Sequence, residues 1–174
     1  MDYKAIASKL IEDYTEDIVR ISKRIHTEPE LGHKEIKASK LLVEELEKHC
    51  FDVKLGVAGM NTAFIARKGS GNPKIGILAE YDCLPGIGHA CGHNLIAASA
   101  FGAAVGLANI IDELGATVIV FGTPAEEGVV QNAGGKVVMI DEIKEADVSI
   151  MIHAGPYWGS YSTTNARESF LVEF

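Results

Sequence analysis

Three segments of the chain place side chains that commonly bind metals directly after apolar runs. The first segment follows residues 75–79 and contains two carboxylates, two imidazoles and a thiol, at Glu80, Asp82, His89, Cys91 and His93. The second segment follows residues 116–122 and contains the adjacent Glu126 and Glu127, and the third ends in His153. Thiolate, imidazole and carboxylate are the ligands of zinc and similar transition ions. One glutamate of an adjacent pair can bind metal while the other carries protons.

Each of these residue types also has a structural explanation. A lone cysteine beside a small-residue helix is usually a buried apolar group, and a glutamate pair can begin a helix, where the dipole favours it. A lone histidine after an apolar strand is more often a core or surface residue. Complementary ligands at three separate strand ends favour the metal site. The remaining histidines and cysteines are interpreted as structural or surface residues and as non-ligands: His26, His33, His49, Cys50 and Cys83.

A second chemistry stays open at this point. Cys91 could be a nucleophile, with His89 or His93 as its base. That mechanism gives the glutamate pair and His153 no role, so the metal site is the preferred interpretation. A free cysteine is mostly protonated near neutral pH, so a Cys91 thiolate requires a metal ion or a strong positive potential.

The elements that must position these residues follow from apolar periodicity. Helical spacing predicts helices over residues 3–26 and 34–49, a long apolar helix that begins after Asn94 as its N-cap and ends near residue 114, and a short helix over 136–143. Strands are predicted at residues 51–55, 62–67, 74–79, 116–122, 147–153, 161–164 and 169–174, with 74–79, 116–122 and 147–153 buried. The alternation of strands and helices after residue 74 predicts an α/β fold with a largely parallel central sheet flanked by helices. Ligands bind at the carboxyl ends of the strands in such sheets.

Composition limits the function classes. The chain has 174 residues, 47% of them apolar, and a net charge of -8 without a basic block, which argues against nucleic acid as a partner. The mixed-charge N-terminus does not have the pattern of a signal peptide, and the apolar segment 95–111 is short for a membrane span. Three cysteines in no repeated pattern do not suggest a disulfide framework. We therefore expect a cytoplasmic protein whose partner is a small-molecule substrate.

The chain resembles the amidohydrolase branch of the dinuclear-zinc metallopeptidases, the relatives of aminoacylase and of certain carboxypeptidases. It is most similar to members of the p-aminobenzoyl-glutamate hydrolase and dipeptidase type. The matching stretches are HTEPELGHKE (26–35), AEYDCLPGIGHACGHN (79–94), GTPAEEG (122–128), GGKVVMI (134–140) and MIHAGP (151–156). The resemblance implies a zinc-peptidase-like catalytic domain that hydrolyses an amide bond in an N-acyl amino acid or small dipeptide-like substrate, releasing an amino acid. It also implies two divalent transition ions, which the ligand set allows to be zinc, manganese or cobalt.

The resemblance also implies a role for each site residue. The implied metal ligands are Cys91, His93, Glu127 and His153, with Cys91 in the place of a bridging aspartate. Glu126 is the implied general base, which takes a proton from the attacking water and returns it to the leaving amine. Asp82 matches an aspartate that orients a ligand histidine two residues before it. That earlier position is Glu80 here, so the roles of Glu80 and His89 are left open.

Relatives of this type are roughly twice as long and contain an inserted lid domain. Residues 1–167 are therefore expected to form the N-terminal part of the catalytic domain, and residues 168–174 the start of a lid and dimerisation domain. The part not present would supply a further ligand histidine, an oxyanion-binding histidine and the usual dimer surface, with a homodimer as the candidate assembly. The alternative function is a truncated, weakly active or inactive fragment that binds metal or a partner chain.

Overall fold

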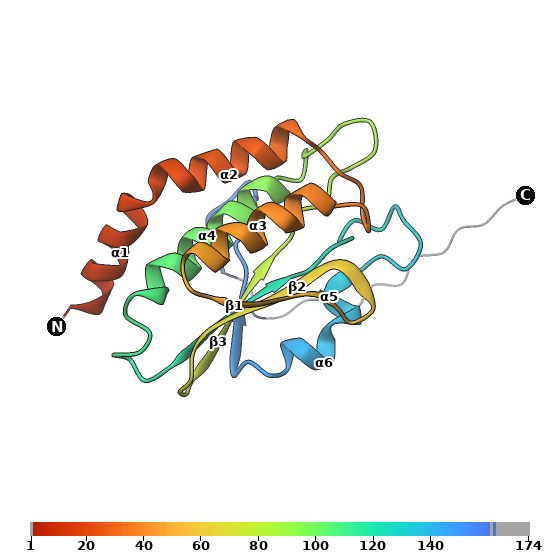
Figure 1. Ribbon diagram of the computed structural model, residues 1–174. Helices are drawn as coiled ribbons and strands as arrows, with labels where there is room; N and C mark the ends of the chain where they lie inside the picture. The colour runs from red at the N-terminus through yellow and green to blue at the C-terminus, as the bar shows by residue number, and fades with distance from the viewer. Residues whose placement is uncertain (1, 161, 163–174) are drawn as a thin grey trace, which may run out of the picture.

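A five-stranded sheet with helices on both faces forms the centre of the computed structural model, which describes residues 2–160 and residue 162 (Figure 1). The strands are β1 (Asp52–Val57), β2 (Met60–Gly69), β3 (Lys74–Ala79), β4 (Thr117–Gly122) and β5 (Val148–Ile150), in the spatial order β1-β2-β4-β3-β5. The predicted α/β class is confirmed.

The sheet is mixed in direction, and only part of it is parallel. β3 is parallel to β4 and to β5, whereas β2 is antiparallel to β1 and to β4. Ala58 and Gly59 both have positive φ, 50° and 72°, in the two-residue turn that joins β1 to β2 as a hairpin. Residues 70–73 between β2 and β3 are too few for the crossover that a parallel connection needs. The prediction of a parallel centre therefore holds for β4, β3 and β5 only.

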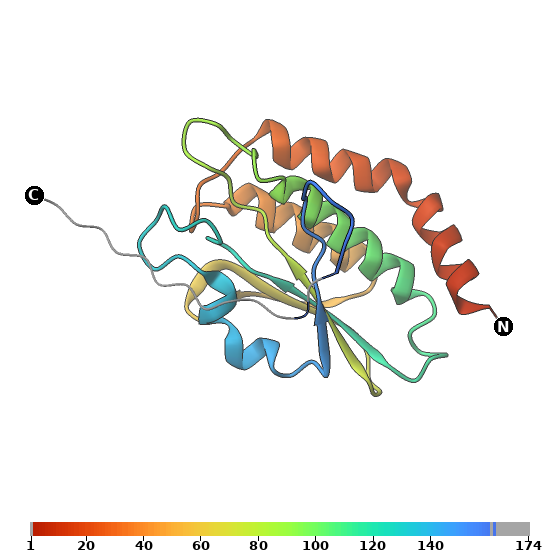
Figure 2. The same ribbon diagram turned by 180° about the vertical axis from the view of Figure 1, so that it is seen from behind.

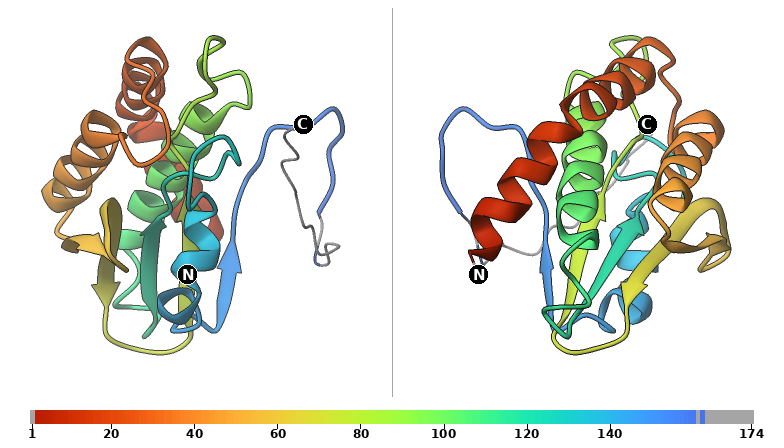
Figure 3. Two further views of the ribbon diagram at one scale, coloured as in Figure 1. Left: turned by 90° about the vertical axis from the view of Figure 1, so that its right-hand side faces the viewer. Right: turned by 60° about the vertical axis from the view of Figure 1, so that its left-hand side comes forward.

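The helices lie unequally on the two faces of the sheet. One face carries α1 (Tyr3–Asp13), α2 (Thr15–Thr27), α3 (Ile36–Lys48) and α4 (His93–Ala108), and the other carries the one-turn helices α5 (Gly135–Val138) and α6 (Ile140–Ile143) (Figures 1 and 3). Successive side chains of β2 and β4 point to opposite faces. Phe64 and Val120 belong to the core under the long helices, whereas Ile65 and Phe121 belong to a smaller core with Met139.

Three predicted helices differ from the structure in detail. The helix predicted over residues 3–26 is two helices, because the Thr15 hydroxyl donates to the Glu12 carbonyl (2.7 Å) and replaces a ladder bond at the junction. The predicted N-cap Asn94 is wrong: Gly92, at φ 81°, precedes the helix, and Asn94 donates to the Ser22 hydroxyl (3.0 Å). The helix predicted over 136–143 is interrupted at Met139.

The strand predicted over residues 147–153 is shorter and less buried than expected. β5 has three residues, all exposed, because it lies at the edge of the sheet with a neighbour on one side only. The chain after β5 passes along the N-terminal half of α4 (Figure 2). The predicted strand 169–174 lies outside the described residues, and so does 161–164 apart from residue 162. None of the helices within the described part of the chain is both long and apolar enough to cross a membrane.

Candidate metal centre

The carboxyl ends of two neighbouring parallel strands define the position of the candidate site. Ala79 of β3 is paired with Gly122 of β4, so both strands end at the same level of the sheet. The chain beyond β3 begins with Glu80, and the chain beyond β4 leads to Glu126 and Glu127. His93 begins α4 beside them. The first two of the segments that the sequence indicated therefore converge at one edge, as the rule for open α/β sheets predicts.

His93 lies at the centre of this cluster and is 1% exposed. Its Nδ1 lies 2.9 Å from Oδ1 of Asp82 and 2.9 Å from the Asp82 carbonyl oxygen. Both partners are acceptors, so Nδ1 carries a proton, and the lone pair of the neutral ring would lie at Nε2. In metal sites, a carboxylate that accepts from one ring nitrogen of a histidine commonly orients the other nitrogen toward the metal.

The Nε2 atom of His93 faces three carboxylates. It lies 3.4 Å from Oε2 of Glu80, 3.7 Å from Oε2 of Glu126 and 3.7 Å from Oε1 of Glu127. It is buried and has no hydrogen-bond partner within the described residues, and the same is true of Glu80 Oε2. Two buried acceptor atoms that face each other without a donor are costly, so the geometry favours a cation between them.

Asp82 connects His93 to the chain segment that carries the glutamate pair. While its Oδ1 accepts from His93, its Oδ2 accepts from the backbone N–H of Glu127 at 3.0 Å. Burial alone would raise the pKa of Asp82, but the hydrogen bonds from His93 and from the backbone outweigh burial and lower it. The ionised Asp82 in turn raises the pKa of His93 against the effect of burial. Asp82 therefore orients a histidine eleven positions after it in the sequence.

The other two predicted ligands lie at the margin of the cluster. His153 is exposed, its ring centroid lies 6.2 Å from that of His93, and one of its nitrogens is grouped with Glu80 and His93 within 4.8 Å. Cys91 is partly exposed and is in neither of the two groups whose ligand atoms lie that close together. The carboxylate of Glu127 beside it, and burial, raise the pKa of the Cys91 thiol to about 11.

The environment of Cys91 does not suit a nucleophilic cysteine. A reactive thiol needs a lowered pKa and a histidine base. The pKa of Cys91 is raised, and His93 is committed to Asp82 through Nδ1. Both ring nitrogens of His89 are buried without a hydrogen-bond partner in the described part of the chain, and its ring centroid lies 6.4 Å from that of His26. The metal interpretation is therefore favoured over the cysteine mechanism.

The donor atoms present fit a divalent transition ion. Imidazole nitrogen and carboxylate oxygen are common zinc ligands. The thiol of Cys91 lies beside the carboxylate of Glu127. The unpartnered Nε2 of His93 and Oε2 of Glu80 are the structural observation that supports this fit. Glu80, His93 and His153 form one group of candidate ligands, and His93, Glu126 and Glu127 form the other.

Comparisons with known proteins find a dipeptidase, a hydrolase subunit and a dinuclear metal-binding peptidase among the relatives. The chain is 32% identical to a human Xaa-Arg dipeptidase over 98% of its own length and 43% of the dipeptidase. It is also 32% identical to one of the subunits of p-aminobenzoyl-glutamate hydrolase from Escherichia coli, over 82% of its own length and 33% of that protein. The structure matches a dinuclear metal-binding peptidase of the M20 family from Bacillus subtilis, with a TM-score of 0.70, 26% identity and coverage of 83% of this chain and 44% of the peptidase.

The chain is homologous to the dinuclear metal peptidases. No protein-family model matches it. It spans less than half the length of each of these relatives. The resemblance recognised in the sequence is thereby confirmed, and the homologues are hydrolases and peptidases.

Two residues without a role predicted from the sequence lie beside the site: Lys136 contacts two of its carboxylates, and Glu35 binds the loop that precedes Glu126. The Lys136 ammonium on α5 contacts Glu80 Oε1 and lies 3.5 Å from Glu126 Oε1. Burial lowers the pKa of Lys136, but Glu80 and Glu126 outweigh that effect and raise it. Glu35 is fully buried, accepting from the backbone N–H of Ala125 at 2.8 Å and from the Thr62 hydroxyl at 2.9 Å. Both residues lie in stretches that carried the resemblance, which was the only signal in the sequence.

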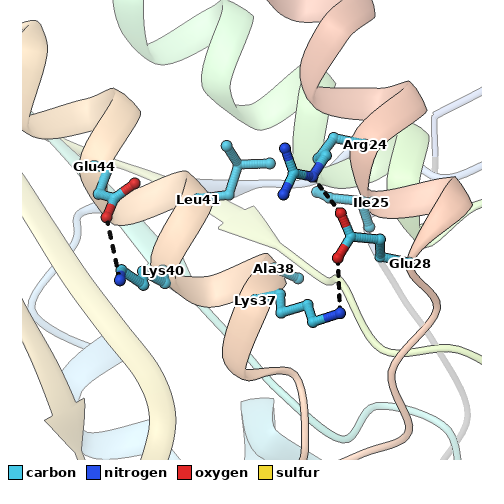
Figure 4. A pocket seen from close by; sticks show the side chains of 8 residues that line it. All are labelled: Arg24, Ile25, Glu28, Lys37, Ala38, Lys40, Leu41 and Glu44. Atoms are coloured by element: carbon cyan, nitrogen blue, oxygen red, sulfur yellow. Dashed lines mark hydrogen bonds and ion pairs between the residues drawn. The ribbon is translucent and has the colours of Figure 1, made fainter.

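A separate hollow between α2 and α3 contains none of the candidate ligands (Figure 4). Its volume is about 260 Å³, and Glu28 lies at its wall between Arg24 and Lys37, whose Nζ is 2.8 Å away. The glutamate is thus already paired with two cations. These contacts join the two helices and leave no unpaired charge on Glu28 to bind a ligand.

Proposed function

We propose that this chain carries the metal centre and the general base of an amide-bond hydrolase. The observation that carries the proposal is the lone-pair nitrogen of His93, which is buried and faces three carboxylates at 3.4–3.7 Å. The proposed ligands are His93, Glu127, His153 and Cys91, with Asp82 as the residue that orients His93. Because the homologues are hydrolases, hydrolysis is favoured over the alternative of a fragment that only binds metal or another chain.

The proposed roles follow from the positions of the side chains. Divalent ions in such a site lower the pKa of a water molecule and polarise an amide carbonyl. Glu126 has one third of its side chain exposed, whereas Glu127 has 17% exposed and its N–H held by Asp82. Glu126 is therefore the carboxylate that water and substrate reach. It takes the proton of the attacking water and delivers it to the leaving amine.

The proposed substrate is an N-acyl amino acid or a small dipeptide-like molecule. The two curated relatives support this class, because one is named for a dipeptide and the other for an aminobenzoyl-glutamate amide. Both compounds contain an amide bond to an amino acid. The proposed reaction therefore releases an amino acid from its acyl group.

Metal content is the first test of this proposal. We expect the purified chain to retain about one to two equivalents of zinc, manganese or cobalt after gel filtration, because a folded set of ligands holds its metal. Cys91→Ala removes one proposed ligand and should therefore retain less metal. Elemental analysis measures both. A chain that retains no metal under any of these conditions would contradict the proposed centre.

Amine release from a panel of N-acyl amino acids and dipeptides is the second test. We expect Glu126→Gln to lower the rate by about 10²–10⁴-fold while the metal content stays unchanged, since the amide cannot accept the proton. Loss of metal together with activity would instead make Glu126 a ligand. Equal rates in the variant and the wild type would exclude it as the base.

The remaining assignments concern the whole protein. We propose that residues 1–167 are the N-terminal part of the catalytic domain, which is supported by relatives of more than twice this length. The lid segment proposed at 168–174 lies outside the described residues. A homodimer and a cytoplasmic location are further proposals, and light scattering and cell fractionation test them.

A further inference from the structure

We propose that Glu80 is itself a ligand of the metal centre, sharing one ion with His93, and that Lys136 holds Glu80 in position for this contact. The inference rests on the proposed metal centre and adds a residue to its ligand set. Glu80 occupies the first position after β3, so a rigid strand end determines where its side chain lies.

The two oxygens of Glu80 have different surroundings. Oε1 contacts the Lys136 ammonium, whereas Oε2 is buried and has no hydrogen-bond partner in the part of the chain that the structure describes. The side chain is fully buried. Leaving a buried carboxylate oxygen without a partner is costly, so its presence in a folded chain calls for a partner that is not a protein donor.

The distance to His93 indicates what that partner is. Glu80 Oε2 and His93 Nε2 lie 3.4 Å apart. A hydrogen bond would bring them to about 2.7–3.2 Å. Two ligand atoms that each lie about 2.0–2.1 Å from one tetrahedral ion are about 3.4 Å apart. Because Asp82 fixes a proton on Nδ1, the neutral His93 ring and Glu80 both offer lone pairs to this point, and the spacing suits a shared metal ion.

The local charge supports the same conclusion. Four carboxylates surround this point, at Glu80, Asp82, Glu126 and Glu127. Among the described residues, Lys136 is the only lysine or arginine that pairs with any of these four carboxylates, and it contacts both Glu80 and Glu126. One lysine cannot balance four carboxylates in a mostly buried cluster, whereas a divalent ion between Glu80 and His93 would.

Zinc binding to Glu80 variants tests the inference without an activity assay. We expect Glu80→Gln to lower zinc affinity at least as much as loss of an outer-shell partner does, about 10–100-fold, in calorimetric titrations with zinc alone. Glu80→Asp keeps the charge but shortens the side chain by one methylene, so we expect a loss there too. Lys136→Met should give a smaller loss, because it frees the Glu80 side chain without removing the ligand.

Glu45→Gln is the matched control. Glu45 is also a buried carboxylate paired with cations, but it lies on α3 outside the site, and its variant should bind zinc like the wild type. Circular dichroism and cooperative unfolding establish that each variant is folded. If Glu80→Gln is unfolded, Glu80→Asp decides the question.

The outcomes separate this inference from the proposed function. If the wild type binds zinc and the folded Glu80 variants bind it equally well, Glu80 is not a ligand and the metal centre still stands. A loss in Glu80→Gln with full binding in Glu80→Asp would show that only the charge matters, which also contradicts ligation. If the wild type binds no zinc, the proposed function and this inference both fail.

Discussion

His93 donates from Nδ1 to Oδ1 of Asp82 at 2.9 Å, and this bond turns its other nitrogen toward the glutamates. The two residues belong to different elements, since Asp82 follows β3 and His93 begins α4. The same aspartate holds the N–H of Glu127 at 3.0 Å. One carboxylate therefore positions an imidazole and the loop of the glutamate pair together.

Asp82→Asn tests this dual role. The amide has a single oxygen, so either the bond from His93 or the bond from Glu127 must be lost. We expect zinc affinity to fall by about 10–100-fold, the usual effect of removing the partner of a metal-binding histidine. Competition with a chelator measures the affinity. Unchanged affinity would mean that Asp82 does not orient His93.

Glu35 offers a second prediction, about the loop after β4. We expect Glu35→Ala to lower the free energy of unfolding by about 2–3 kcal/mol, since the Ala125 N–H and the Thr62 hydroxyl are left buried and unpaired. Glu35→Gln keeps an oxygen for Ala125 and should lose much less. Burial raises the pKa of Glu35, so a neutral amide suits this position. Urea denaturation measures the free energy of unfolding of both variants. If Glu35→Ala and Glu35→Gln lose the same amount, these hydrogen bonds do not stabilise the loop.

Gly135 supports a third prediction, about close packing of α5 on the same loop. A Cβ at this position would lie 2.0 Å from the Pro124 carbonyl oxygen, a backbone atom that cannot rotate away. We expect Gly135→Ala to lower the thermal midpoint and to weaken zinc binding, because it displaces Lys136 and the segment that precedes Glu126. Gly128→Ala is the control, since nothing lies within 4 Å of its added Cβ. The idea fails if both variants unfold at the same temperature.

Glu45 supports a fourth prediction, about pH and stability. It accepts from Arg20 at 3.1 Å and from Lys48 at 2.9 Å. Burial opposes its charge, but these bonds outweigh burial and lower its pKa below the ordinary value of 4.5. A lowered pKa stabilises the folded state above 4.5, and this contribution is lost as pH falls through the folded-state pKa.

We therefore expect Glu45→Gln to cost about 1 kcal/mol at pH 7, the upper range for a partly exposed ion pair. The difference from the wild type should shrink as pH falls below 4.5. Urea titrations at several pH values measure it. A difference that is constant with pH would mean that the ion pairs do not contribute.

Much of the fold and site could be predicted because local patterns fix them. The run 74–79 is β3 as predicted, since the five apolar and small residues after Lys74 suit a strand inside the sheet. His93, Glu126 and Glu127 are brought together as expected, because parallel strands end at one edge. The break at Thr15 could not be predicted, because it depends on a single hydrogen bond from the Thr15 hydroxyl. The exposure of β5 could not be predicted either, because it depends on the position of this strand at the edge of the sheet.

The sequence by itself determined the chemistry available to this protein: which donor atoms it has and at which strand ends they lie. Only the tertiary structure decided which of them face one another. Asp82 accepts a hydrogen bond from His93, and Glu80 directs an unpartnered oxygen toward the same histidine. Cys91 lies at the margin of this cluster of ligands. The physical reason is that side-chain direction depends on contacts between distant segments. Such contacts leave no periodic pattern in the chain.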